Sequence, residues 1–243
     1  MLTANQILTL AKGQLGVKEV PSGSNTVKYN TEYYGRTVAG SAYPWCCVFI
    51  WWLFHYLGAD NLFFGGGKTA SCTTLMQYAK QHKLWVTKDY KPGDLILFNF
   101  DSDSAAEHIG ICESTNAGYI TCIEGNTSIT SDDNGGSVMR RTRPLRQVLG
   151  AYRPQYATAA TIKTTTSKEA TKVTVEVTVL KQGAKGSPVR KLQILLNGLG
   201  HSCGTVDGSF GSKTLSAVKA FQKANKLTVD GSVGPATWGK LLG

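Results

Sequence analysis

The side chains best suited to nucleophilic chemistry in this sequence are six cysteines, and four histidines are available as proton acceptors. Cys46 has the most favourable setting, because Pro44-Trp45 precedes it and an apolar stretch, 48–54, follows. This pattern predicts a buried helix with Cys46 in its first turn, where the positive end of the helix dipole favours a thiolate. Cys47 lies about 100° further around that helix and is expected to be a core residue. The predicted chemistry is attack by a cysteine thiolate on an electrophilic carbon.

A cysteine nucleophile needs a base within reach, and His108 is the histidine best placed for this role. His55 lies nine residues along the same predicted helix, more than about 13 Å from Cys46. His82 lies in a polar stretch, and His201 belongs to a different part of the chain. The search for the base therefore ends at His108.

The strand that begins at His108 is predicted to form a hairpin with the strand 119–124. A turn centred near Asn116 pairs residues whose numbers sum to about 232. His108 is then expected opposite Glu124, with Cβ atoms about 5 Å apart, so that the carboxylate can hold the imidazole in one tautomer. Asn126 would share this face if the strand continued, which makes it a candidate second support.

The elements that must position these residues follow from hydrophobic periodicity and turn signals. Helices come first in this part of the chain and antiparallel strands follow, which predicts an α+β domain. Helices are expected over 3–15, 45–57 and 73–82, and strands over 94–100, 108–113, 119–124, 138–141 and 149–152.

A change of composition divides the chain. The segment 156–176 is rich in Thr, Ala and Lys, which predicts a flexible linker between a catalytic domain over 1–155 and a second domain over 177–243. Residues 156–243 hold 12 basic and 4 acidic side chains, a net charge of +8, whereas the first 155 residues carry +2. This charge predicts attraction to a polyanion, such as nucleic acid, a membrane surface or an anionic cell-wall polymer.

The second part contains an internal repeat. The segment 205–211, TVDGSFG, recurs 23 residues later as 228–234, TVDGSVG. Each copy supplies an Asp-Gly turn ahead of a predicted helix, over 214–226 and 235–242, and an apolar stripe over 188–199 predicts a third helix. A small all-α three-helix domain is expected.

The motifs of both parts resemble known families. The C-terminal segments 183–197, 206–222 and 227–242 resemble the peptidoglycan-binding module found at the ends of many wall hydrolases. The stretch Gln14–Glu19 fits the N-terminal helix of the CHAP family, the cysteine, histidine-dependent amidohydrolases/peptidases. Four further motifs resemble that family: Trp45-Cys46, Lys91-Pro92-Gly93-Asp94-Leu95, Glu107-His108-Ile109-Gly110 and Ile123-Glu124-Gly125-Asn126.

The resemblance implies a papain-like fold and the hydrolysis of amide bonds in bacterial peptidoglycan. The combination of such a domain with a wall-binding module resembles phage or prophage endolysins. The resemblance leaves open whether the activity is that of an N-acetylmuramoyl-L-alanine amidase or of a peptide endopeptidase. Cys46 would be the nucleophile, His108 the base, and Glu124 the residue that orients it. A backbone N–H at the start of the Cys46 helix would bind the oxyanion, with Gln14 as a second donor by analogy with papain-like sites. Tyr43 and Trp45 are candidates to line the substrate cleft.

No cofactor is implied, and no metal site is expected. The cysteines show no paired CxxC, and most are expected to be buried free thiols. The sequence lacks an Asp-x-Asp-x-Asp-Gly loop, and the pairs Asp101/Asp103 and Asp132/Asp133 are interpreted as solvated loop residues.

The expected partners are bacterial peptidoglycan and anionic wall polymers. A nucleic-acid partner is disfavoured, because no basic stretch carries interleaved aromatic residues. Membrane insertion is disfavoured because no run approaches about 18 apolar residues. The N-terminus lacks the features of a secretory signal, so the chain is expected to be made in the host cytoplasm and to act at the cell wall.

Two alternatives remain open. An NlpC-type endopeptidase also uses Cys and then His, but a third polar group usually replaces the glutamate. A non-catalytic wall- or polyanion-binding protein would have no use for the set Cys46, His108 and Glu124.

Overall fold

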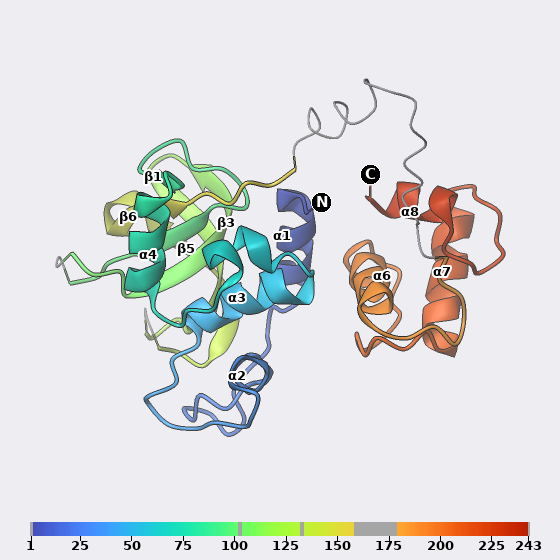
Figure 1. Ribbon diagram of the computed structural model, residues 1–243, viewed down its shortest axis with the longest axis horizontal. Helices are drawn as coiled ribbons and strands as arrows, with labels where there is room; N and C mark the ends of the chain where they lie inside the picture. The colour runs from blue at the N-terminus through green and yellow to red at the C-terminus, as the bar shows by residue number, and fades with distance from the viewer. Residues whose placement is uncertain (1, 102–103, 132–133, 158–178, 243) are drawn as a thin grey trace. The chain divides into compact units, whose positions relative to one another are not determined.

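The computed structural model describes residues 2–101, 104–131, 134–157 and 179–242. The chain forms two compact units, Met1–Ala157 and Thr158–Gly243 (Figure 1). From residue 158 onward, the linker predicted over 156–176 lies outside the described residues. Within the described ranges, no helix has the length and apolar character needed to cross a membrane.

The first unit is built on a six-stranded sheet in the order β1-β6-β2-β3-β4-β5, in which every neighbouring pair is antiparallel. Helices together with an antiparallel sheet agree with the α+β prediction. The strands are β1 (Trp85–Val86), β2 (Leu95–Phe98), β3 (His108–Asn116), β4 (Tyr119–Thr127), β5 (Ser137–Pro144) and β6 (Val148–Tyr152).

The helix α3 (Cys46–Tyr56) is the centre of this unit. Its first nine residues are all buried, and it contacts α1, α2, β3 and β4. A helix that is apolar on every side is expected to be enclosed in this way. The other helices are α1 (Ala4–Lys12), α2 (Lys28–Tyr34), α4 (Cys72–Gln81), which packs against β1 and β6, and the 3₁₀ turns η1 (Asp60–Leu62), η2 (Phe64–Gly66) and η3 (Leu145–Gln147).

The helix α1 is shorter than the sequence predicts. Thr3 caps it, and Gln6 completes a capping box at its first turn. The helix ends at Gly13, so the stretch Gln14–Glu19 that was assigned to the N-terminal helix of the CHAP family lies outside α1. Its Lys18 instead forms an isolated bridge with Ser137, the first residue of the edge strand β5. This stretch therefore extends the edge of the sheet near the predicted site.

The β3–β4 hairpin differs from the predicted register. Its two-residue turn is 117–118, with positive φ values of 43° and 86°, and β3 continues through Asn116. A bulge near the middle of β3 shifts the pairing once more. Glu124 therefore lies opposite Gly110 and not opposite His108, so the predicted pairing was wrong by two residues.

The described part of the second unit contains α6 (Ser187–Gly198), α7 (Ser212–Ala224) and α8 (Pro235–Leu242). Apolar side chains from these helices and the segments between them form one core. Its buried members include Leu180, Val189, Leu192, Leu196, Phe210, Val218, Phe221 and Val233.

The sequence repeat corresponds to two equivalent turns, each fixed by a buried glutamine. Gln193 Nε2 donates to Asp207 Oδ1 at 2.9 Å, and Gln193 Oε1 accepts from the backbone N–H of Gly208 at 2.8 Å. Gln222 makes the same two hydrogen bonds, to Asp230 Oδ1 and from the backbone N–H of Gly231, both at 2.9 Å. Buried polar groups satisfied in this way hold the two Asp-Gly turns in one conformation.

Candidate active site

Cys46 lies where the sequence predicts it, as the first residue of α3. Trp45 is the N-cap residue, and its carbonyl accepts from the Phe49 N–H at 2.8 Å. The cysteine is 5% exposed, and its Sγ lies 3.7 Å from the Sγ of Cys72, the first residue of α4. Two helices thus direct their N-terminal cysteines at one point.

His108 and Glu124 meet although they do not face each other across the hairpin. An offset of two residues keeps both side chains on the same face of the sheet. A Cβ at Gly110 would lie 2.7 Å from Glu124 Cγ, so the glycine leaves the space through which the glutamate passes. His108 Nε2 then lies 3.0 Å from Glu124 Oε2, with both side chains fully buried.

Arg143 on β5 holds the other side of the glutamate, and the sequence analysis did not identify it. Its Nε donates to Glu124 Oε1 and its Nη2 to Oε2, each at 2.8 Å. The guanidinium lies 5.3 Å and 4.8 Å from the ring centroids of Phe98 and Phe100. Two parallel charge-assisted bonds fix the carboxylate in one plane. In the sequence, nothing distinguishes Arg143 from an arginine that points from a strand into water.

The charges around Glu124 set the protonation of the site. Burial by itself would raise the pKa of Glu124, but hydrogen bonds from His108 and Arg143 outweigh it and lower the pKa below its ordinary range. Burial also opposes ionisation of His108, but interaction with Cys46 and the hydrogen bond and charge of Glu124 raise its pKa to about 9. Glu124 therefore favours an imidazolium at His108.

The surroundings of Cys46 favour its uncharged thiol form. Its contact with Cys72, followed by burial, raises its pKa well above the ordinary value, and interaction with His108 partly offsets this rise. The helix dipole alone, on which the sequence prediction relied, does not decide the state of this thiol. Among the described residues, His108 Nδ1 has no hydrogen-bond partner. This nitrogen is the one available to exchange a proton with Cys46.

Trp45 is a core residue, which corrects the expectation that it lines a cleft. It is fully buried, and its indole Nε1 donates to Glu19 Oε1 at 2.8 Å. A Cβ at Gly125 would lie 2.9 Å from the Trp45 ring and 2.6 Å from Phe49 Cβ. The glycine thus allows β4 to approach the start of α3 closely. Glu19, which the sequence analysis gave no role, holds the residue directly before the nucleophile.

Gln14, Asn126 and Tyr43 occupy three different settings. The Gln14 carboxamide oxygen accepts from Lys28 Nζ at 2.6 Å and from the Tyr29 hydroxyl at 3.2 Å. The carboxamide oxygen of Asn126 accepts from a backbone N–H in the β4–β5 connection at 3.3 Å, in place of the expected support for His108. Tyr43 remains half-buried and stacks edge-on against a neighbouring tyrosine. Of the three, Tyr43 keeps exposed surface near the start of α3.

The remaining histidines and cysteines lie elsewhere. His55 bonds Asp60 at 2.6 Å, and His82 stacks on the ring of Tyr78. All six cysteines are free and buried, as the sequence predicts. In the part of the chain that the structure describes, no three His, Cys, Asp or Glu side chains are grouped to hold a metal ion. The acidic positions 103, 132 and 133 lie outside the described residues.

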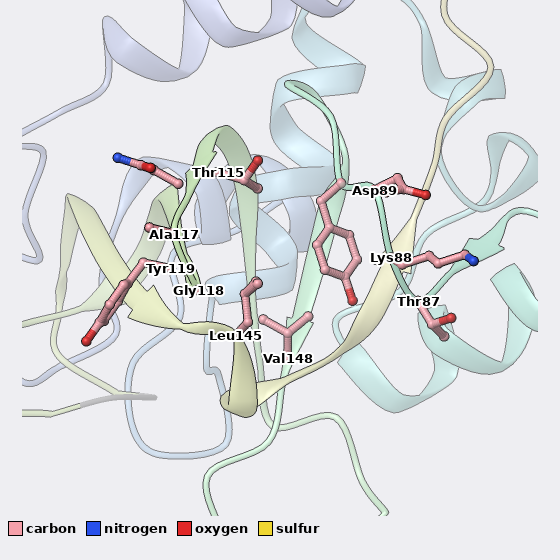
Figure 2. A pocket seen from close by; sticks show the side chains of 11 residues that line it. Thr87, Lys88, Asp89, Thr115, Ala117, Gly118, Tyr119, Leu145 and Val148 are labelled. Carbon is pink, nitrogen blue, oxygen red and sulfur yellow. The ribbon is translucent and has the colours of Figure 1, made fainter.

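A separate cavity of about 450 Å³ lies at the turn end of the β3–β4 hairpin, whereas His108 and Glu124 lie at the other end of these strands. Figure 2 shows Lys88 and Asp89 on one side of it, Thr115 and Tyr119 on the other, and apolar side chains at the base. The lining contains no cysteine or histidine, so the chemistry of the Cys46 cluster does not extend to it.

Two family models match the chain. Residues 38–126 match the CHAP domain, and residues 185–241 match a putative peptidoglycan binding domain. Cys46, His108 and Glu124 all lie inside the first match, whereas Arg143 lies outside it.

Curated relatives match over shorter segments. The chain is 43% identical over 79 residues to the N-acetylmuramoyl-L-alanine amidase CwlL of Bacillus licheniformis, which is 32% of this chain and 22% of the relative. It is 42% identical over 64 residues to the zinc D-Ala-D-Ala carboxypeptidase of Streptomyces albus G, 26% of this chain and 25% of the relative. The chain spans about half or less of the length of the curated relatives it matches.

Solved structures with similarity include two endolysins. The endolysin LysIME-EF1 is 14% identical, with 65% of this chain and 67% of that chain covered and a TM-score of 0.36. A Burkholderia AP3 phage endolysin is 40% identical, with 26% of this chain and 24% of that chain covered and a TM-score of 0.25.

Proposed function

We propose that this CHAP-domain protein is a bacteriolytic peptidoglycan hydrolase of the endolysin type, with Cys46 as its nucleophile. The observation that carries the proposal is the buried arrangement of Cys46, His108 and Glu124, with the free Nδ1 of His108 available to the thiol. A nucleophile, a base and a group that orients the base are the components that acyl transfer requires. The match to the CHAP domain over 38–126 supports the same conclusion.

In the proposed reaction, His108 Nδ1 takes the proton of the Cys46 thiol as the sulfur attacks the carbonyl carbon of an amide bond. The tetrahedral intermediate collapses when the imidazolium gives this proton to the leaving nitrogen. Water, deprotonated by His108, then attacks the thioester and releases the carboxylic acid. Glu124 stabilises the imidazolium in both halves of the reaction, because its carboxylate accepts from Nε2.

The oxyanion is proposed to bind the backbone N–H groups at the start of α3. The first N–H groups of a helix have no partner inside the helix and point out of its N-terminal end, where Cys46 is the first residue of α3. Gln14 is a weaker candidate for this role than the sequence suggested, because its carboxamide oxygen is already held by Lys28 and Tyr29.

The C-terminal module is proposed to hold the enzyme on its substrate. Its match to a peptidoglycan-binding domain supports this role, and its positive charge suits the anionic polymers of the wall. A hollow of about 400 Å³ in this module offers serine hydroxyl groups and one ammonium group to a glycan or a carboxylate. Its lining comprises Ser202, Cys203, Gly204, Ser212, Lys213 and Ser216.

The bond that is cut is proposed to be either the N-acetylmuramoyl-L-alanine amide or a peptide bond of the stem or cross-bridge. Purified sacculi from several Gram-positive species would be incubated with the wild-type protein, and the released ends analysed by mass spectrometry. A free L-alanine N-terminus identifies an amidase, and a new terminus inside the stem or cross-bridge identifies an endopeptidase. Failure to release any end from any wall would favour a non-catalytic wall-binding protein.

A further inference from the structure

Cys72 is a second thiol in contact with the proposed nucleophile, and the reaction described above makes no use of it. Its Sγ lies 3.7 Å from Cys46 Sγ, so the two sulfurs are in van der Waals contact. Each cysteine is the first residue of its helix, and each keeps 5% of its surface exposed. The two sulfurs therefore meet at the N-terminal ends of α3 and α4.

We propose that Cys46 and Cys72 form an oxidative modification site that takes a hydroperoxide as its co-substrate. The Cys46 thiolate attacks the peroxide oxygen, the O–O bond breaks, and Cys46 becomes a sulfenic acid while hydroxide leaves. The Cys72 sulfur then attacks the sulfenic sulfur, and water leaves as the disulfide forms. In total, two thiols and one hydrogen peroxide give one disulfide and two waters. This inference rests on Cys46 being the nucleophile of the proposed hydrolase.

The neighbouring histidine favours Cys46 as the thiol that is oxidised first. His108 can accept its proton, as in the hydrolytic reaction, and its interaction with Cys46 opposes the rise in the thiol pKa that the Cys72 contact and burial cause; no described histidine acts on Cys72 in this way. Cys72 is correctly placed to resolve the sulfenic acid, because a disulfide has an S–S distance of about 2.05 Å and the two sulfurs need to approach by only about 1.7 Å.

The other cysteines of the unit lack one of these features. Cys47 directs its sulfur at the Thr69 carbonyl oxygen, at 3.4 Å. Cys112 and Cys122 lie opposite each other on β3 and β4, inside an apolar cluster that holds no histidine. They are a matched internal control, because they form a neighbouring thiol pair without a base.

The consequence is reversible inactivation. A disulfide removes the nucleophile, and exchange with a reducing thiol restores both cysteines. Without Cys72, the sulfenic acid has no partner and further peroxide converts it to the sulfinic acid, which thiols do not reduce. Cys72 would thus protect the enzyme from permanent loss of activity in an oxidising environment.

The test uses the full-length wild-type protein and Cys72→Ser, each treated with hydrogen peroxide, quenched, alkylated and digested with trypsin. Cleavage after Lys68 separates the peptide of Cys46 from that of Cys72, so a disulfide appears as a cross-linked pair lighter by two hydrogens. Cys47→Ser establishes which of the two adjacent cysteines is joined. Wall lysis is measured before oxidation, after oxidation and after reduction with dithiothreitol.

We expect the cross-link in the wild type and in Cys47→Ser, with lysis reduced more than about 100-fold by peroxide and recovered on reduction. Cys72→Ser should be active when reduced, should lose lysis on oxidation, and should not recover. Peroxide treatment that leaves Cys46 and Cys72 unlinked, or recovery of Cys72→Ser equal to that of the wild type, overturns the proposal. The cross-link is scored by mass, so it is tested even if the reduced protein proves unable to cut any wall.

Discussion

Replacing Arg143 with methionine should expose how much the buried pair at Glu124 contributes to folding. The guanidinium makes two bonds of 2.8 Å to a carboxylate that has no exposed surface. Methionine keeps the apolar stem beside Phe98 and Phe100 but leaves the glutamate charge with His108 as its cation. Removing one partner of such a pair costs about 3–5 kcal/mol in the free energy of unfolding.

A double-mutant cycle separates this charge effect from lost packing. In Arg143→Met/Glu124→Gln no buried carboxylate remains, so the double variant should lose less stability than the sum of the two single variants, by more than about 1 kcal/mol. Arg143→Lys keeps the charge but not the two parallel bonds, and it should fall between the wild type and Arg143→Met.

Urea unfolding of the full chain, followed by tryptophan fluorescence, measures these differences. Four of the five tryptophans lie in the first unit, so the signal follows that unit. Wall lysis should fall together with stability in Arg143→Met, because the carboxylate that stabilises the His108 imidazolium is no longer held. A loss below about 1 kcal/mol for Arg143→Met, or a strictly additive cycle, would refute the role given to this pair.

Three further predictions follow from single features of the structure. Gly125→Ala places a Cβ 2.6 Å from Phe49 Cβ, so α3 must move away from β4, and both urea stability, by about 1–3 kcal/mol, and lysis should decrease. The pKa of His108 is raised from 6.5 to about 9, so its contribution is complete below about pH 6.5 and disappears as the pH rises through 9. The stability difference between wild type and His108→Gln, up to about 3 kcal/mol at pH 6, should therefore shrink toward pH 10; a difference that grows with pH would contradict the assignment. Truncation after residue 170 should leave cleavage of soluble fragments intact and weaken sedimentation with sacculi, and equal sedimentation would make the C-terminal module a spacer.

Local patterns in the sequence were sufficient for the parts of the site that depend on neighbouring residues. The apolar stretch after Cys46 predicts α3 and places the cysteine at its start, and the structure has both. The face shared by His108 and Glu124 also follows from the alternation of a strand. The pairing register did not follow, because one bulge and a turn displaced from Asn116 shift it without changing the apolar pattern.

The contacts that the sequence analysis missed join residues distant in the chain. Arg143 reaches Glu124 from β5, Cys72 reaches Cys46 from α4, and Glu19 reaches Trp45 from the stretch after α1. None of these pairs has a characteristic spacing, because the fold and not the local chain brings them together. A buried charged side chain becomes recognisable only when its partner is known.

The comparison of Cys46→Ala with Cys47→Ala tests the central claim most directly. Both variants remove one thiol from the first turn of α3, but of the two only Cys46 interacts with His108. Purified sacculi would be mixed with each variant, and both the loss of turbidity and the fraction of protein that sediments with the walls would be measured. We predict that Cys46→Ala sediments as the wild type does but releases nothing, while Cys47→Ala still lyses the wall. Lysis by Cys46→Ala, or its loss in Cys47→Ala with sedimentation intact, would contradict the assignment of the nucleophile.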